Sequence, residues 1–265
     1  MENNFVCNEK LCKYPDGRCS GGCVFFKDRA IVCPIRKEWD IKVRMDCEIK
    51  KAHVEGKYDF SDYKGTDSNV PILEELSDNY SHYLGSNFYV WGRNSTQKTT
   101  MLKAYARHLI KNNPIGVFSY NRGYTEDFNY VLNDKYPFLV RFISMSGLLN
   151  ILRRNADMNS DIRESTMFDI YENESCRVLI IDESFDSKKI LSHSDYDISL
   201  LDSFIRKRME SASLTTFFIS NTRPENIGSA FGESLRSFIC RECELLEFNS
   251  KIDDTMKKFT IRRAQ

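Results

Sequence analysis

The pattern of apolar and polar residues changes at about residue 70. From there onward, short apolar runs alternate with segments whose apolar residues recur every three or four positions. Apolar runs of four to seven residues are typical of strands buried on both faces of a parallel sheet, and the longer periodic segments are typical of amphipathic helices. The predicted strands are 88–91, 115–120, 138–144, 177–182, 215–220 and 244–248, and the predicted helices are 99–110, 124–134, 146–155, 161–173 and 196–211. This alternation predicts an α/β fold in which helices cover a parallel sheet.

The first 69 residues have a different pattern. Residues 1–55 contain six of the nine cysteines, and residues 56–69 are polar, as expected of a linker. We therefore expect three parts: a small Cys-rich domain over 1–55, a linker over 56–69 and the α/β domain over 70–265. A domain of about fifty residues has little core of its own, so a bound metal would supply much of its folding energy.

The spacing of the early cysteines predicts a metal site. In a reducing compartment, clustered thiolates more often hold a metal than form disulfides, and Zn²⁺ takes four ligands. The candidate ligands are Cys7, Cys12, Cys19, Cys23 and Cys33, with Cys47 or His53 in reserve. Buried thiols without a metal are the first alternative, and an iron–sulfur cluster is the second. Cys240 and Cys243 lack enough partners for a site, and we expect them to pack in the core.

Charge and composition narrow the class of protein. The 265 residues carry 38 Lys and Arg against 38 Asp and Glu, and no apolar run approaches membrane-spanning length. The first residues have no signal-peptide pattern, so we expect an intracellular protein without a membrane anchor. The balance conceals sorted charges, because residues 97–112 are basic and residues 161–186 are mostly acidic. Nucleic-acid binding would therefore have to depend on local patches.

The segment after the first strand of the α/β domain matches most of a phosphate-binding loop. Residues 92–100 read Gly-Arg-Asn-Ser-Thr-Gln-Lys-Thr-Thr, which fits the pattern G-x-x-x-x-G-K-[ST] at Gly92, Lys98 and Thr99. Lys98 would reach the terminal phosphates of a nucleotide, and the hydroxyl of Thr99 would bind Mg²⁺, with Thr100 beside it. Gln97 stands where glycine is expected, at a position where the backbone must come close to the nucleotide. The alternative is an ordinary strand–turn–helix junction.

Two later strands end in polar residues that fit the same chemistry. The strand over 177–182 ends at Asp182 and Glu183, at the sheet edge where α/β folds bind ligands. Asp182 would hold Mg²⁺ and Glu183 would activate the attacking water as a general base. The next strand is followed by Asn221, which could contact the terminal phosphate. The alternatives are a solvated acidic turn for the first pair and a turn before Pro224 for Asn221.

Together these motifs resemble an AAA+ ATPase, and within that group the DnaC/DnaI-type replicative helicase loaders and the IstB-type transposition ATPases. The resemblance spans about residues 70–248. Its landmarks are 92–100, 142–154, 180–183, 205–222 and 231–239, which correspond to Walker A, the segment between the Walker motifs, Walker B, sensor 1 and the arginine-finger box. It implies a P-loop three-layer sandwich without a helical lid. It also implies that Arg236, with Arg241 as the rival, inserts into the nucleotide of a neighbouring subunit.

The resemblance implies a function and partners. A loader would bind ATP and Mg²⁺, self-associate through the ATPase domain, and place a hexameric replicative helicase on single-stranded DNA, in the cytoplasm of a bacterial or phage-infected cell. The Cys-rich front, with Zn²⁺, would dock the helicase, although its aromatic and basic residues could bind nucleic acid instead. Gln97 and Ser95 depart from the family pattern, which implies weak hydrolysis. The alternatives are an IstB-like ATPase that recruits a transposase on duplex DNA, and a degenerate adaptor that binds ATP without hydrolysing it.

Overall fold

The chain divides into two compact units, Met1–Glu48 and Ile49–Gln265. The computed structural model describes residues 18–20, 23–26, 29–32, 42, 45–46, 48–50, 52–56, 58, 60, 70–79, 83, 85–94, 96–112, 138–156, 176–186 and 194–248. The division falls after Glu48, earlier than the expected end of the Cys-rich part at 55. Ile49, Ala52 and Val54 are buried, which ties this short stretch to the second unit.

The first unit contains a small antiparallel sheet that the sequence did not predict. Its strands are β1 (Arg18–Ser20), β2 (Cys23–Phe26) and β3 (Arg29–Val32), in that order. In the register, Cys19 is opposite Val24, and Cys23 is opposite both Ser20 and Val32. Cys7, Cys12 and Cys33 lie outside the described residues, so the proposed ligand set stays a prediction.

The second unit is built on a five-stranded parallel sheet, as the apolar runs predict. The order across the sheet is β5-β6-β7-β4-β8, and each neighbouring pair is parallel. The strands are β4 (Asn87–Gly92), β5 (Phe138–Ser144), β6 (Cys176–Asp182), β7 (Thr215–Ser220) and β8 (Cys243–Phe248). Every residue of β7 is buried, because the strand lies inside the sheet and has side chains packed on both faces.

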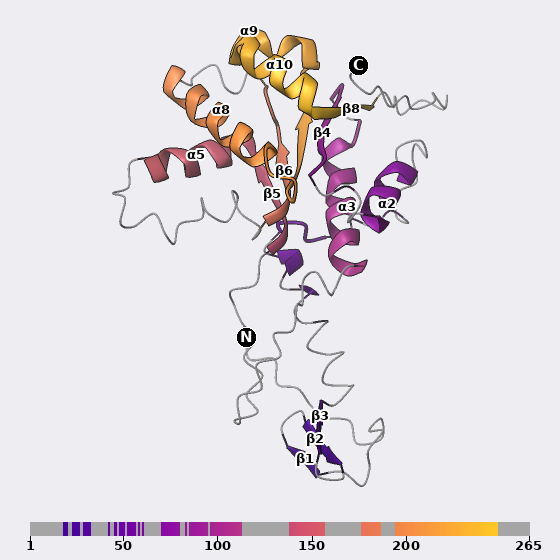
Figure 1. Cartoon of the computed structure of the whole chain (residues 1–265). Helices are drawn as coiled ribbons and strands as arrows, with labels where there is room; N and C mark the ends of the chain where they lie inside the picture. Colours follow the sequence, from indigo (N-terminus) through magenta and orange to yellow (C-terminus); the bar gives the residue numbers. More distant parts are fainter. Residues whose placement is uncertain are drawn as a thin grey trace. The chain divides into compact units, whose positions relative to one another are not determined.

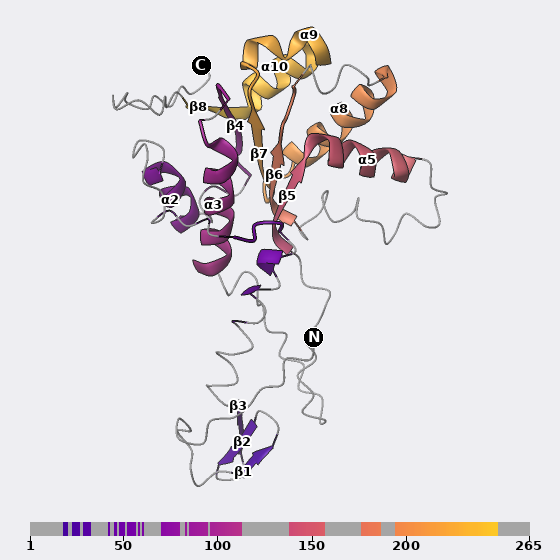
Figure 2. The same ribbon diagram turned by 180° about the vertical axis from the view of Figure 1, so that it is seen from behind.

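Helices cover both faces of this sheet, which gives three layers (Figures 1 and 2). On one face lie α3 (Lys98–Asn112) and, outside it, α2 (Val70–Asp78). An aromatic cluster packs α3 against the sheet. Phe88 of β4 stacks on Phe217 of β7 with ring centroids 4.6 Å apart, and the Tyr105 ring of α3 lies 5.0 Å from the Phe217 ring. Phe60, expected in the linker, is buried and lies 5.2 Å from the His108 ring of α3.

The other face is covered by four helices that share one apolar core. They are α5 (Met145–Ala156), α8 (Asp195–Met209), α9 (Gly228–Phe231) and α10 (Glu233–Glu242), and a short 3-10 helix, η5 (Pro224–Asn226), precedes α9. Their side chains enclose Tyr89 of β4, Phe218 of β7 and Phe185. Both faces of the central strands are thus withdrawn from water, which is the main stabilisation of such a sheet.

Most predicted elements in the described residues are confirmed. The strands over 138–144 and 215–220 have the expected bounds, and the other described strands and helices differ by one or two residues at an end. The predicted elements at 115–120, 124–134 and 161–173 lie outside the described residues. The sequence did not predict α2 or α10. Within the part of the chain that the structure describes, we find no helix with the length and apolar character needed to cross a membrane.

Candidate functional site

Three neighbouring strands end at the same edge of the sheet, and their ends carry the residues that the sequence singled out. The strands β6, β7 and β4 lie side by side, and they lead to Glu183, to Asn221 and to the loop that precedes Lys98. In open α/β sheets, ligands bind at the carboxyl ends of the strands, at the point where the strand order reverses. This edge is the candidate site.

Lys98 lies at the centre of the site. Its Nζ is 3.0 Å from the carbonyl oxygen of Gly92, 2.9 Å from that of Arg93, 3.1 Å from Oγ1 of Thr96 and 3.0 Å from Oδ1 of Asn221. The residue is buried, and burial lowers the pKa of its ammonium to about 8, although the charge of Asp182 acts in the opposite direction. An ammonium has three donors, so these four neutral acceptors exceed what it can bond at once. A buried ammonium among neutral oxygens favours the approach of an anion.

Thr99 and Asp182 form the second part of the site. The Thr99 hydroxyl lies 3.0 Å from Oδ2 and 3.2 Å from Oδ1 of Asp182, and the Glu183 amide donates to Oδ1 at 2.8 Å. Burial raises the pKa of the Asp182 carboxyl, against the effect of these hydrogen bonds. A hydroxyl beside a carboxylate is the hard-oxygen donor pair that Mg²⁺ prefers, and a divalent cation would also relieve the desolvation of Asp182. The donor set therefore fits Mg²⁺.

In the loop between β4 and α3, Gln97 has the backbone conformation expected of the glycine that it replaces. Gln97 has φ of 61°, the left-handed conformation that glycine adopts freely, and its side chain is exposed. Its carbonyl oxygen accepts the first hydrogen bond of α3, from the Met101 amide at 2.9 Å. A Cβ at Gly92 would collide with the carbonyl oxygen of Phe248 on β8, so glycine is required there. Thr100 is half-buried in the first turn of α3.

The structure brings together the predicted residues of the loop and of the two strand ends, and it adds others. Thr96, Ser220 and Thr222 also make hydrogen bonds at this edge. The run of polar residues over 220–222, after a strand that is apolar from 217 to 219, was the available signal for the last two. Their partners could not be identified without knowing that β6 and β7 are neighbours.

Arg236 and Arg241 lie on α10, and each forms an ion pair with a glutamate of the same helix. Arg236 pairs with Glu233, one turn earlier, and about a third of its side chain is exposed. Arg241 pairs with Glu242 at 2.6 Å and is more exposed. A role toward a neighbouring subunit stays a prediction for both.

The predicted metal site gains no support in the described residues. Among them, no group of three or more His, Cys, Asp or Glu side chains could hold a metal ion. His53, a reserve ligand, is exposed on the surface, and Cys47 lies outside the described residues. Cys243 is buried and belongs to the apolar core, as expected, while Cys240 is partly exposed.

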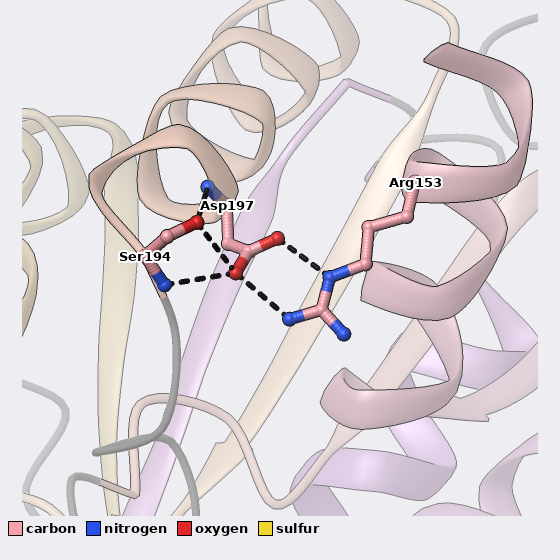
Figure 3. Close-up of polar contacts among 3 residues, drawn as sticks. All are labelled: Arg153, Ser194 and Asp197. Atoms are coloured by element: carbon pink, nitrogen blue, oxygen red, sulfur yellow. Dashed lines mark hydrogen bonds and ion pairs between the residues drawn. The ribbon is translucent and has the colours of Figure 1, made fainter. Parts of the chain in front are cut away.

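A second polar cluster, away from the site, joins α5 to α8 (Figure 3). Arg153 donates from Nε to Oδ1 of Asp197 at 2.6 Å and from Nη2 to Oδ2 at 2.8 Å. Asp197 also accepts from the amide of Ser194 at 2.9 Å, and Ser194 caps the start of α8 in return. The hydrogen bonds from the Arg153 guanidinium, and after them those of the capping box, hold the pKa of Asp197 below its usual range. With its oxygens occupied by a cation and a helix cap, this cluster has a structural role.

The comparisons with known proteins bear on the fold. No protein-family model matches the sequence, and no curated protein is similar enough to be matched to it. Among solved structures, the chain is similar to a DnaC helicase loader, at 15% identity and a TM-score of 0.50, over 73% of this chain and 99% of that chain. It is also similar to domain III of the replication initiation protein DnaA from Thermotoga maritima, at 15% identity and a TM-score of 0.50, over 73% of this chain and 68% of that one.

A third structure with this fold has a bound nucleotide. It is a replication initiator DnaA bound to AMPPCP and single-stranded DNA, with 16% identity and a TM-score of 0.51, and the match covers 75% of this chain and 51% of that chain. At such identities the likeness establishes the fold alone. The chain thus has the α/β fold that its motifs predict, and it shares this fold with the DnaC loader and with DnaA.

Proposed function

We propose that this protein binds ATP with Mg²⁺ at the carboxyl edge of its sheet and acts as an ATP-dependent helicase loader in DNA replication. The observation that carries the proposal is the convergence at one edge of a buried lysine, a hydroxyl–carboxylate pair and the Asn221 amide. In sequence these residues are up to 123 positions apart. Burying an ammonium and a carboxylate costs free energy, and such pairs of perturbed charges are typical of binding sites.

Each residue would have a distinct task. Lys98 would exchange one of its four neutral acceptors for a phosphate oxygen, and the amides at the start of α3 would bind the same anion. Thr99 and Asp182 would hold Mg²⁺, which supplies charge neutralisation for the phosphates when bound. Glu183, exposed at the tip of its turn, would accept a proton from the attacking water, and Asn221 would contact the terminal phosphate.

Gln97 is compatible with this role. Because the residue already has a left-handed backbone and its side chain is exposed, the loop keeps its shape without glycine. We expect nucleotide binding with slow turnover. The degenerate adaptor, which binds ATP without hydrolysing it, stays the alternative. In trans, Arg236 would leave Glu233 and contact the nucleotide of the next subunit, where an arginine stabilises charge on the transferred phosphoryl group.

The loader function is supported by the breadth of the match to DnaC, which extends over nearly all of that chain. DnaA, bound to a nucleotide analogue and single-stranded DNA, has the same fold. The partners we propose are therefore a hexameric helicase and single-stranded DNA, with self-association through the ATPase domain. A zinc-bearing front domain over residues 1–55 that docks the helicase is part of the same proposal.

The first experiment is a calorimetric titration with ATP and Mg²⁺. Lys98→Ala should weaken binding by about 10- to 100-fold, because a charge-assisted hydrogen bond to phosphate contributes roughly 1.5–3 kcal/mol. Lys111→Ala is the matched control, since it removes the same charge from the last turn of α3. Thermal melts check that both variants fold. Equal affinity for wild type and Lys98→Ala would contradict the site.

The second experiment separates the loader from its alternatives. Purification of the tagged protein from its native host should recover a replicative helicase, and the pair should assemble on single-stranded DNA when ATP is present. Recovery of a transposase, with preference for duplex DNA, would favour the IstB-like alternative. ATP binding without turnover under any of these conditions would favour the adaptor.

A further inference from the structure

The turn that follows β6 has an unusual backbone. Glu183 has φ of 54° and Phe185 has φ of 56°, so two non-glycine residues in three adopt the left-handed conformation. Such residues are disfavoured, and they persist only where their surroundings hold them in place. The turn carries the glutamate that the proposed function uses as a general base.

The end of β7 holds this turn through backbone and side-chain hydrogen bonds. The Ser184 amide donates to the carbonyl oxygen of Ile219 at 2.7 Å, and the Ser220 hydroxyl donates to the carbonyl oxygen of Ser184. The Thr222 hydroxyl donates to the carbonyl oxygen of Phe185 at 2.9 Å. The two successive carbonyl groups after Glu183 are therefore fixed by two hydroxyls, one from the last residue of β7 and one from Thr222, two residues later.

Thr222 is itself held in position. Its amide donates to the Ser220 hydroxyl at 3.0 Å, and its carbonyl oxygen accepts from the Tyr89 hydroxyl of β4 at 2.9 Å. The Phe185 ring is fully buried and lies 6.0 Å from the Tyr89 ring and 5.1 Å from the Phe231 ring. The turn, the end of β7 and β4 thus form one bonded unit.

We propose that Thr222 and Ser220 are positioning residues that set the direction of Glu183 relative to Asn221. Asn221 lies between them in the chain, and its amide oxygen is 3.0 Å from Nζ of Lys98. Any shift of the strand end therefore moves both the residue facing the phosphate and the turn that carries the base. The inference rests on the proposed function, since it gives the hydroxyls of Thr222 and Ser220 a role in the hydrolysis attributed to Glu183.

The chain offers a matched pair of substitutions. Thr222→Val keeps the shape of the side chain and removes the hydroxyl, whereas Thr222→Ser keeps the hydroxyl. Thr215→Val is the control, because the Thr215 hydroxyl also donates to a backbone carbonyl, that of Tyr83 at 3.0 Å, but at the start of β7, whereas Thr222 lies just past the end of that strand. A loss that is only structural should be similar in the two valine variants.

The experiment measures kcat, KM and ATP affinity in the full-length protein. Thr222→Val should lower kcat by about 10- to 100-fold with ATP affinity unchanged, because a small misplacement of a catalytic group can cost that much in rate. Thr222→Ser should restore kcat, and Thr215→Val should leave kcat as in wild type. Amide exchange at Ser184, measured by NMR, should accelerate in Thr222→Val but not in Thr222→Ser.

Glu183→Gln separates the two ways of failing. If this variant retains full turnover, the role of Glu183 in the proposed function is wrong. If it stops turnover while Thr222→Val keeps the wild-type kcat, the positioning role alone is overturned. Unchanged exchange at Ser184 in Thr222→Val would overturn it as well, even in a chain that turns over too slowly for a reliable kcat.

Discussion

Two carboxylates of the same unit, Asp182 and Asp197, have opposite surroundings. Asp197 receives two hydrogen bonds from the Arg153 guanidinium, and its pKa lies below the usual range. Asp182 receives its hydrogen bonds from a threonine hydroxyl and a backbone amide, and burial raises its pKa. The charge of Asp197 is already neutralised by Arg153, whereas Asp182 remains suited to an added cation. Ionisation of Asp197 therefore stabilises the fold, whereas ionisation of Asp182 prepares a binding site.

The largest effect expected from this comparison is on stability. Asp197→Asn should lower the free energy of unfolding by about 2 kcal/mol, below the 3–5 kcal/mol typical of a broken buried pair, because 38% of the Arg153 side chain is exposed and water screens the charge. Asp182→Asn should leave stability unchanged or slightly raised, since its ionised form is disfavoured in the folded state. Urea denaturation at pH 7 measures both. Equal losses in the two variants would contradict the contrast.

A somewhat smaller effect is expected when pH changes the stability contribution of Asp197. Because the pKa of Asp197 is lowered on folding, its contribution to stability is complete above about pH 5 and is lost as pH falls toward the folded-state pKa. The stability difference between wild type and Asp197→Asn should therefore shrink between about pH 5 and pH 2. For Asp182 the sign is reversed, because protonation relieves its desolvation. Denaturation curves at several pH values give the test, and a difference that is constant with pH would argue against the Arg153 pair.

The smallest effect concerns the loop beside Asp182. Gln97→Gly should raise the free energy of unfolding by about 1 kcal/mol, because glycine removes the penalty of a left-handed residue. Asn94→Gly, in the same loop, is the control, since Asn94 is not among the residues with positive φ and glycine there should not stabilise. Chemical denaturation measures the difference. Equal shifts in the two glycine variants would mean that the conformation of Gln97 is not strained.

Much of the fold could be predicted because β4 and β6 contain runs of consecutive apolar residues, over 88–91 and 178–181, and that pattern depends only on burial. The helix α10 was not predicted, although Leu235, Phe238 and Ile239 have helical spacing, because the helix is only ten residues long. The residues of the site were predicted from motifs, and the structure brings Lys98, Asp182 and Asn221 to one edge. The hydrogen bond from the Thr222 hydroxyl to the carbonyl oxygen of Phe185 could not be predicted, since it depends on β6 and β7 being neighbours.

In the proposed function, Asp182 and Thr99 hold Mg²⁺ for a nucleotide bound by Lys98. Its most direct test is calorimetric titration of ATP into wild type and Asp182→Asn, each with Mg²⁺ and with the metal chelated. We expect Mg²⁺ to tighten ATP binding to wild type by at least about tenfold and to have little effect on Asp182→Asn. An ATP affinity of wild type that does not change with Mg²⁺, or an undiminished Mg²⁺ effect in Asp182→Asn, would contradict it.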